Sequence, residues 1–203
     1  MKKKIALLGS TGSIGKSLLE LIKKKDFEII FLAANKNYKK LLKQAEIFNV
    51  KNLIISDYKS YKKLILINKN KKIKIYNNFN SFEKIITKKL DYVMSSISGI
   101  SGLKPTYEII KFTKKIAIAN KESLICAWPI LLKELKKHNT EFVPVDSEHF
   151  SIWSEIKEAH SKRINKIYLT ASGGPLHKLK ISSLKNVKTS NKFLTPSLNA
   201  SCN

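Results

Sequence analysis

Short apolar runs alternate with longer amphipathic segments through most of this 203-residue chain. An apolar run of about four to eight residues indicates a buried strand, and the periodic segments between such runs are typical of helices. Regular alternation of this kind predicts an α/β fold with a doubly wound, mostly parallel sheet covered by helices on both faces. We expect strands at Lys4–Leu8, Phe27–Ala33, Asn52–Ile55, Ile73–Tyr76, Asp91–Ser96, Ile116–Ala119 and Glu141–Val145.

Helical periodicity marks the segments between these runs. Their apolar residues recur every three or four positions, as on a helix with one buried face. Pro129 fits the first turn of a helix better than its interior, because proline lacks an N–H and fixes its backbone angle. We expect helices at Ser13–Lys25, Tyr38–Phe48, Tyr58–Ile67, Phe82–Lys88 and Pro129–His138.

The chain is strongly basic, with 39 Lys and Arg against 15 Asp and Glu and a formal net charge of +24. Such a charge suggests a polyanionic partner. Arg163 is the lone arginine, however, and the lysines are spread over every segment. Nucleic-acid-binding proteins concentrate charge on one face and use arginine for bases and phosphates. We therefore expect no nucleic-acid partner, and a lysine-rich surface that favours small anionic substrates.

Cysteine usage and the N-terminal segment bear on the compartment. Cys126 and Cys202 cannot form a disulfide framework, and Cys126 sits in an apolar stretch where we expect a buried thiol. The apolar run after the first lysines is too short for a signal peptide, and no segment is long enough to cross a bilayer. We expect a cytoplasmic protein with no membrane partner.

A glycine-rich loop, GSTGSIG, joins the first predicted strand to the first predicted helix. Gly9, Gly12 and Gly15 let the backbone turn tightly and bring a nucleotide diphosphate against free N–H groups at a helix N-terminus. The spacing differs from the commoner G-x-G-x-x-G, so a simple strand-to-helix turn is the alternative. The position after the first strand of a doubly wound pattern favours the nucleotide site.

The segment after the second predicted strand bears on the choice of cofactor. A carboxylate there holds the ribose hydroxyls of NAD, but this chain has Asn35, Lys36 and Asn37. A lysine in that place attracts a 2′-phosphate, so the sequence favours NADPH. The alternative is that Lys36 is one more lysine of a lysine-rich surface.

Three polar clusters follow later predicted strands, where ligands bind in open α/β sheets. They begin at Asn120, Asp146 and Ser172. In the second cluster, Asp146 and Glu148 would point to the same side of an extended segment and could bind Mg²⁺ or Mn²⁺ through hard oxygen atoms. Two carboxylates do not complete a metal site, and an acidic cap on a helix beginning near Ser147 is the alternative.

Five short motifs occur in order along the chain: GSTGSIG, AANKN, ANKES, PVDSEH and LTASGGP. Together they resemble the 1-deoxy-D-xylulose 5-phosphate reductoisomerase family, from Lys4 to about Lys180. The resemblance implies a homodimeric enzyme of non-mevalonate isoprenoid biosynthesis. Its reaction would be the NADPH-dependent, divalent-metal-dependent reductive isomerisation of 1-deoxy-D-xylulose 5-phosphate to 2-C-methyl-D-erythritol 4-phosphate. A hard cation that polarises substrate oxygens and a cofactor that donates hydride agree with these residues.

The resemblance also implies a role for each motif residue. Cofactor-binding residues would be Thr11, Gly12, Ser13, Ile14, Asn35, Lys36, Asn37, Asn120 and Glu122. The phosphorylated sugar substrate would contact Lys121, Ser147, Glu148 and Ser172. The metal ligands would be Asp146 and Glu148, and the catalytic residues Lys121, Asp146 and Glu148. We assign residues 1–145 to an NADPH-binding Rossmann-like domain and residues 146–203 to the start of an α+β catalytic domain.

After the SGGP segment the chain departs from the family pattern. The covering loop, the third metal carboxylate and the C-terminal helical domain are not recognisable in the closing segment KTSNKFLTPSLNASCN. We expect roughly half of the family's chain to be missing, through a frameshift or an early stop after about Lys188, and a disordered tail from about Thr189. Uncovered apolar faces would then lower solubility. A truncated, inactive NADPH-binding module is the alternative to an active enzyme.

Overall fold

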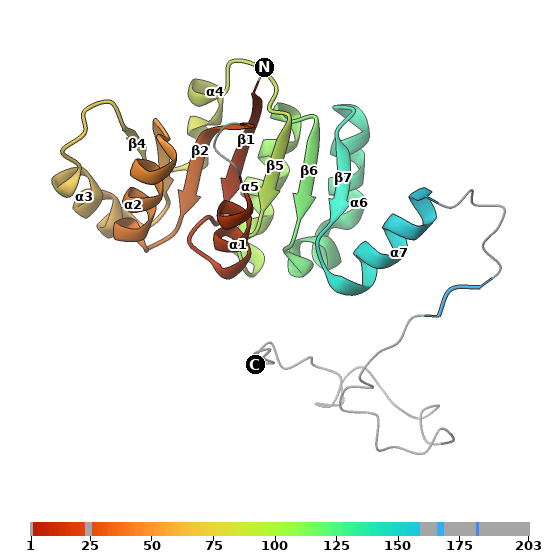
Figure 1. Cartoon of the computed structure of the whole chain (residues 1–203). Coiled ribbons are helices and arrows are strands. Elements are labelled where there is room, and N and C mark those ends of the chain that lie inside the picture. The colour runs from red at the N-terminus through yellow and green to blue at the C-terminus, as the bar shows by residue number, and fades with distance from the viewer. Residues whose placement is uncertain (1, 23–25, 159–165, 169–181, 183–203) are drawn as a thin grey trace. The chain divides into compact units, whose positions relative to one another are not determined.

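The computed structural model describes residues 2–22, 26–158, 166–168 and 182. Within these residues, seven parallel strands form one sheet in the order β4-β3-β2-β1-β5-β6-β7 (Figure 1). The prediction of a doubly wound α/β sheet is confirmed. The strands are β1 (Lys3–Leu8), β2 (Phe27–Ala34), β3 (Asn52–Ile55), β4 (Lys74–Tyr76), β5 (Tyr92–Ser95), β6 (Lys115–Ile118) and β7 (Glu141–Pro144).

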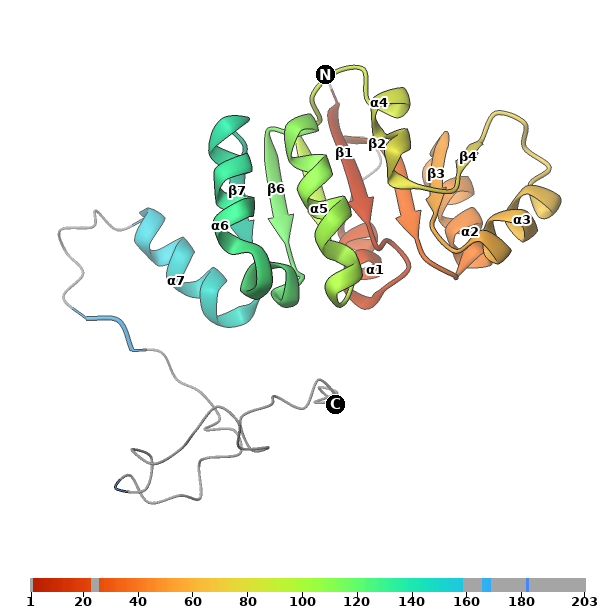
Figure 2. The same ribbon diagram turned by 180° about the vertical axis from the view of Figure 1, so that it is seen from behind.

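Helices cover both faces of the sheet (Figures 1 and 2). On one face of the sheet, an apolar layer lies between the strands and the first three helices, α1, α2 and α3. On the other face, a second apolar layer lies between the strands and the next three helices, α4, α5 and α6. Short 3₁₀ turns lie at Phe79–Ser81, Ile100–Gly102 and Ile110–Phe112. The helices are α1 (Ser13–Leu21), α2 (Tyr38–Phe48), α3 (Tyr58–Ile67), α4 (Phe82–Ile85), α5 (Leu103–Ile109), α6 (Lys121–Lys137) and α7 (Ser147–Glu158).

Burial on both faces explains why the strand runs are continuously apolar. Successive side chains of a strand point to opposite faces of the sheet. In β1, Ala6 and Leu8 join the layer under α4, α5 and α6, whereas Ile5 and Leu7 join the layer under α1, α2 and α3. All four side chains are at most 2% exposed. A parallel strand covered on both sides therefore shows no alternation of apolar and polar residues.

Helix α6 is two helices joined at a kink. Ala127 leaves the helical backbone angles, with φ −138° and ψ 20°. Pro129 lies in the first turn of the second part, where its missing N–H is not needed, as the sequence predicts. Cys126 is exposed, so the prediction of a buried thiol is wrong. Cys126 is exposed because it does not lie on the buried face of α6. The buried residues of that helix are Ser123, Ala127, Leu131 and Leu135.

The chain divides into two compact units, Met1–Ser154 and Glu155–Asn203. The domain boundary between residues 145 and 146 stays a prediction. Ser172 and the predicted disordered tail from about Thr189 lie outside the described residues. No helix in the described part of the chain has the length and apolar character needed to cross a membrane.

Candidate functional site

The predicted ligand-binding segments meet along one edge of the sheet, where the parallel strands end. The glycine loop follows β1, and the chain crosses from one side of β1 to the other before β5. Asn120 and Asp146 follow β6 and β7, the next two strands along this edge. Ligands bind where the winding direction of such a sheet reverses. The strand ends that lie in register here are Leu8, Ala33, Ser95, Ile118 and Pro144.

The backbone of the glycine loop has no room for side chains at two of its three glycines. Gly9 has φ +87°, and a Cβ there would lie 2.7 Å from the carbonyl oxygen of Ser96. A Cβ on Gly15 would lie 2.5 Å from the carbonyl oxygen of Gly9. Gly12 has no such close neighbour, since its nearest atom would be 3.4 Å away. The loop is therefore folded tightly against the segment that follows β5.

Gly12 occupies the position before the first residue of α1. It carries no side chain that could cap the helix, and its own N–H donates to the carbonyl of Gly9 at 3.1 Å. An uncapped helix N-terminus presents N–H groups and the positive end of the helix dipole to an anion. Ser13 and Ile14 are exposed at this opening, and Thr11 is half-buried. The geometry fits the diphosphate of a nucleotide.

A buried polar pair ties the glycine loop to α2, and the sequence analysis missed it. The Ser10 hydroxyl donates to Gln44 Oε1 at 2.8 Å, and Gln44 Nε2 donates back to the Ser10 carbonyl at 2.9 Å. Ser10 is fully buried and Gln44 is 7% exposed. The one feature of the sequence that indicates this contact is a glutamine, Gln44, on the apolar face of the predicted helix Tyr38–Phe48. The pair fixes α2 beside the loop.

The segment after β2 places its three predicted cofactor residues in different roles. Asn35 Nδ2 donates to the Ser56 hydroxyl at 2.8 Å, and Asn37 Oδ1 accepts from the Lys40 N–H at 3.3 Å as the cap of α2. Lys36 is exposed. Hydrogen bonds from Ser60 lower the pKa of the nearby Asp57 carboxyl, and the charge of Lys36 contributes to that lowering. The cofactor role of Lys36 stays a prediction.

Asn120 is a buried clamp between β6 and the segment after β5. Its Nδ2 donates to the carbonyls of Ile97 and Gly99, the latter at 2.7 Å. Its Oδ1 accepts from the Ser123 N–H at 2.8 Å and caps α6. These bonds use the side chain within the protein, so a cofactor contact from Asn120 would come from its backbone. Lys121 and Glu122 begin α6 directly after this clamp.

Asp146 stands at the N-terminus of α7, which begins at Ser147. Its Oδ1 accepts from the His149 N–H at 2.8 Å and lies 2.7 Å from His149 Nδ1. The prediction of an extended segment through Asp146 and Glu148 is wrong, because Glu148 lies in the first turn of α7. The acidic-cap alternative describes the local geometry. The side chains of Ser147 and Glu148 lie outside what the structure describes.

Charge and burial act on Asp146 in opposite directions. Burial raises the pKa of this carboxyl, whose side chain is 7% exposed, but the hydrogen bonds from His149 and the charges of His149 and Lys121 outweigh burial and lower it overall. Lys121 and Asp146, both predicted catalytic residues, therefore lie close enough to interact. Among the described residues, no group of three or more His, Cys, Asp or Glu comes together as a metal site.

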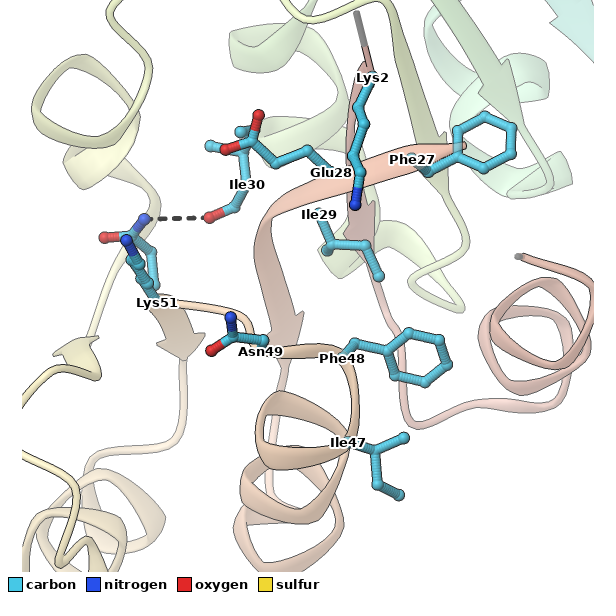
Figure 3. Close-up of a pocket in the computed structure, with 10 residues that line it drawn as sticks. Lys2, Phe27, Glu28, Ile29, Ile30, Ile47, Phe48, Asn49 and Lys51 are labelled. Carbon is cyan, nitrogen blue, oxygen red and sulfur yellow. Dashed lines mark hydrogen bonds between the residues drawn. The ribbon is translucent and has the colours of Figure 1, made fainter. Parts of the chain in front are cut away.

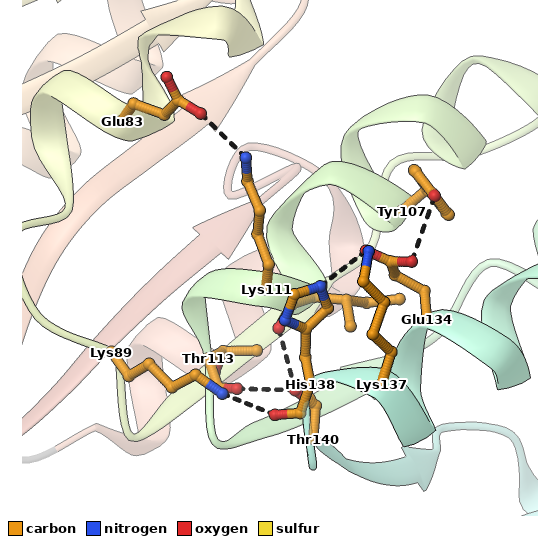
Figure 4. Close-up of polar contacts among 10 residues, drawn as sticks. Glu83, Lys89, Tyr107, Lys111, Thr113, Glu134, Lys137, His138 and Thr140 are labelled. Atoms are coloured by element: carbon orange, nitrogen blue, oxygen red, sulfur yellow. Dashed lines mark hydrogen bonds and ion pairs between the residues drawn. The ribbon is translucent and has the colours of Figure 1, made fainter.

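At the opposite edge of the sheet, where the strands begin, the described residues include no predicted site residue. A hollow of about 420 Å³ lies there, between the start of β2 and the end of α2 (Figure 3). Glu134 accepts hydrogen bonds near the end of α6, from His138 Nε2 at 2.8 Å and from the Tyr107 hydroxyl at 3.3 Å (Figure 4). Burial raises the pKa of Glu134, but these partners and Lys137 lower it overall.

Fold and loop together define a doubly wound α/β protein with a glycine loop of the dinucleotide-binding type. The family model for 1-deoxy-D-xylulose 5-phosphate reductoisomerase matches residues 5–128, and the model for the C-terminal domain of that enzyme matches residues 142–200. The chain belongs to the 1-deoxy-D-xylulose 5-phosphate reductoisomerase family. The resemblance drawn from the motifs is confirmed, and its end moves from about Lys180 to residue 200.

Individual relatives agree with this assignment. The 1-deoxy-D-xylulose 5-phosphate reductoisomerase of Pelagibacter ubique is 54% identical over 96% of this chain and 51% of its own length. That of Wolbachia pipientis is 39% identical over 97% of this chain and 51% of its own length. The chain thus spans about half the length of the curated relatives it matches.

Solved structures of the family share the fold. The reductoisomerase from Zymomonas mobilis in complex with NADPH gives a TM-score of 0.79 at 32% identity, over 93% of this chain and 50% of that one. A reductoisomerase in complex with NADPH, fosmidomycin and magnesium gives a TM-score of 0.71 at 30% identity, over 92% of this chain and 49% of that one.

Proposed function

We propose that this chain supplies the cofactor-binding half of a 1-deoxy-D-xylulose 5-phosphate reductoisomerase. The reaction would be the NADPH-dependent reductive isomerisation of 1-deoxy-D-xylulose 5-phosphate to 2-C-methyl-D-erythritol 4-phosphate. The observation that carries the proposal is the glycine loop, in which two glycines meet backbone atoms where a Cβ would stand, beside the uncapped N-terminus of α1. A tight turn alone would not need both features.

Residues along the strand ends would hold the cofactor in order. Thr11, Gly12, Ser13 and Ile14 would bind the diphosphate where α1 opens, with the N–H groups of Ser13 and Ile14 as donors and Gly12 leaving room for the close approach. Asn35, Lys36 and Asn37 would lie at the adenosine end, and Asn120 and Glu122 would lie toward the reacting end. Bound NADPH supplies the hydride for the reduction.

The substrate side would begin with Lys121. Its positive charge acts on the Asp146 carboxyl and helps to lower the pKa of that group. A lysine in that place can bind a phosphate or an anionic oxygen of the sugar substrate as a point charge. Ser147, Glu148 and Ser172 would complete the substrate contacts.

Asp146 and Glu148 would be two ligands of Mg²⁺ or Mn²⁺. Carboxylate oxygens suit these hard cations, and the lowered pKa keeps Asp146 ionised. The cation, when bound, polarises substrate oxygens. Further ligands would come from the substrate or from residues outside the described part.

The experiment that tests this function follows NADPH absorbance after 1-deoxy-D-xylulose 5-phosphate and Mn²⁺ are added to the 203-residue chain. Consumption of NADPH that is lost in Asp146→Ala would support the enzyme. NADPH binding without consumption would support the second candidate, a module that holds NADPH without turnover. The glycine loop is complete in this chain, which favours NADPH binding. The apolar side chains Ile125, Ile130 and Phe150 on α6 and α7 are exposed and need a covering partner, which favours a module without turnover.

The family resemblance also motivates the remaining proposals, a cytoplasmic location and a homodimer. Sedimentation of the purified chain at several concentrations tests the dimer. A single species at the monomer mass across the range would contradict it.

A further inference from the structure

A lysine-rich segment lies at the edge of the sheet that ends in β4. It runs from Tyr58 to Phe82 and includes α3, the turn after that helix, and β4 (Figure 1). The segment contains seven lysines and neither Asp nor Glu, whereas residues 83–158 contain 12 lysines against 10 acidic residues. Lysines occur throughout the chain, but in this segment no acidic residue accompanies them.

All seven lysines of the segment are exposed, and together they define the basic patch. In the described part of the chain, none of them is in an ion pair. The patch therefore presents a concentrated positive charge to solvent. It consists of Lys59, Lys62, Lys63, Lys69, Lys71, Lys72 and Lys74.

An exposed leucine lies within the basic patch. Leu64 is fully buried and fixes the inner face of α3, so the opposite face points to solvent. On that outer face, Leu66 lies one helical turn after Lys62 and Lys63. Leu66 is 83% exposed, and the isoleucines on either side of it are also exposed. The outer face of α3 thus combines an apolar tip with amines around it.

The stability of α3 explains neither the lysines nor the leucine. Lys59 lies in the first turn, where a cation opposes the helix dipole. Lys59 and Lys63 are four residues apart, and like charges at that spacing repel each other. Leu66 adds no buried area to the core. A negatively charged surface facing α3 would remove the repulsion, and an apolar layer within that surface would cover Leu66.

The combination of charge and apolar surface selects the partner. Nucleic acids offer phosphates, but proteins use arginine to bind them, and this segment contains no arginine. An anionic bilayer attracts lysines to its headgroups and also accepts apolar side chains at the boundary below them. We propose that α3 and the turn after it bind the surface of an anionic membrane, with Leu66 in the headgroup layer.

Binding of this kind is peripheral. The stems of the lysines lie along the apolar boundary while their ammonium groups stay among the headgroups. A peripheral contact needs no spanning segment, so it is compatible with the lack of a spanning helix among the described residues. It replaces the sequence-based expectation of no membrane partner. The inference is independent of the proposed cofactor function, because it requires no NADPH.

The test measures co-sedimentation of the 203-residue chain with lipid vesicles at about 0.1 M salt. One set of vesicles contains equal parts of phosphatidylglycerol and phosphatidylcholine, and the other contains phosphatidylcholine alone. We expect binding to the anionic vesicles only. Lys62→Gln combined with Lys63→Gln should weaken that binding about tenfold, because two attractions to the headgroups are lost. The matched control, Lys133→Gln combined with Lys136→Gln, removes the same charge from exposed positions of α6 and should change binding less than about twofold.

A second pair of variants tests the leucine. Leu66→Ser should weaken binding to the anionic vesicles about fivefold, because less apolar surface enters the headgroup layer. Leu21→Ser is the matched control, since Leu21 on α1 is 79% exposed but lies outside the basic patch. It should change binding less than about twofold.

Three results would overturn the inference. Equal weakening by the two double variants would show that net charge alone explains the binding. Unchanged binding in Leu66→Ser, or no binding of the unmodified chain to the anionic vesicles, would contradict the proposed contact directly. Binding to duplex RNA that is tighter than binding to the vesicles, lost in the Lys62 and Lys63 double variant but kept in Leu66→Ser, would identify a nucleic-acid partner instead.

Discussion

The glycine loop and the Asp146 region lie along the same edge of the sheet, and they differ in how many contacts among the described residues hold them in place. At the glycine loop, close contact with the backbone of Ser96 and Ile97, a buried Ser10–Gln44 pair and packing on both faces of the sheet fix the geometry. At Asp146, the hydrogen bonds among the described residues come from His149 of the same helix turn. Apolar side chains nearby on α6 and α7 are exposed. The glycine loop, the proposed cofactor end, is thus held by contacts from several elements, whereas Asp146, at the proposed metal end, is held within one helix turn.

The largest expected effect on stability comes from a substitution in the glycine loop, the proposed cofactor end. Gly15→Ala would place a Cβ 2.5 Å from the Gly9 carbonyl, so the loop must move. We expect a loss of about 3 kcal/mol in the free energy of unfolding, measured by urea denaturation. Gly99→Ala is the control for backbone strain alone, because Gly99 has φ +72° but open space around a Cβ, and should cost about 1 kcal/mol. Equal losses in the two variants would show that the loop is not tightly packed.

The next effect lies between the two ends, at the Asn120 clamp. Asn120→Ala removes two hydrogen bonds to carbonyls and the cap of α6, in a side chain that is 2% exposed. We expect a loss of about 2 kcal/mol in unfolding free energy, since buried partners are left unpaired. Asn37→Ala, at an exposed cap with one such bond, should cost about 1 kcal/mol or less. A larger loss for Asn37 would reverse the proposed ranking.

A smaller effect sharpens the comparison at the metal end. Asp146→Ala removes the cap of α7 and should cost about 1 kcal/mol in unfolding free energy. Asp146→Asn keeps a capping oxygen and should leave stability within about 0.5 kcal/mol while weakening Mn²⁺ binding, measured by titration calorimetry. Mn²⁺ binding retained in both variants would remove Asp146 from the metal site.

The smallest expected effect is at Asp91, on the opposite edge of the sheet where the strands begin, and it serves as a reference for the site edge. Asp91 accepts hydrogen bonds from Lys114 Nζ and the Lys4 N–H, each at 2.8 Å, and these bonds lower the pKa of its carboxyl. A lowered pKa adds stability above the unfolded value of about 3.9, and that stability is lost as the pH falls through the folded pKa. Because the side chain is a third exposed, we expect about 0.5 kcal/mol. Asp91→Asn should flatten the acid limb of a stability-against-pH curve, and an unchanged curve would contradict the prediction.

The sequence predicts the strands and the longer helices well because burial on both faces leaves unbroken apolar runs. Tyr38–Phe48 and Tyr58–Ile67 agree with the structure to the residue. Helix α5 was missed, because Pro105 and the preceding glycines suggest a loop, although proline is tolerated in a first turn.

The site was predicted less completely than the fold. Motifs pointed to the loop and to Asp146, but the pair Ser10–Gln44 joins residues from different elements, which local patterns do not show. The extended interpretation of Asp146 and Glu148 failed for a local reason. Asp146 accepts from the backbone three residues later, which starts a helix.

The central position of β1 has a consequence for synthesis on the ribosome. One edge of β1 can pair with β2 as soon as Ala34 has emerged, but its other edge waits for Tyr92–Ser95 of β5. At about 5–20 residues per second, a nascent chain spends several seconds with that edge unpaired. Gly9 packs against Ser96, so the glycine loop has its packing partner only after this later segment has been synthesised. Nucleotide binding by nascent chains would therefore report that both halves of the sheet have joined.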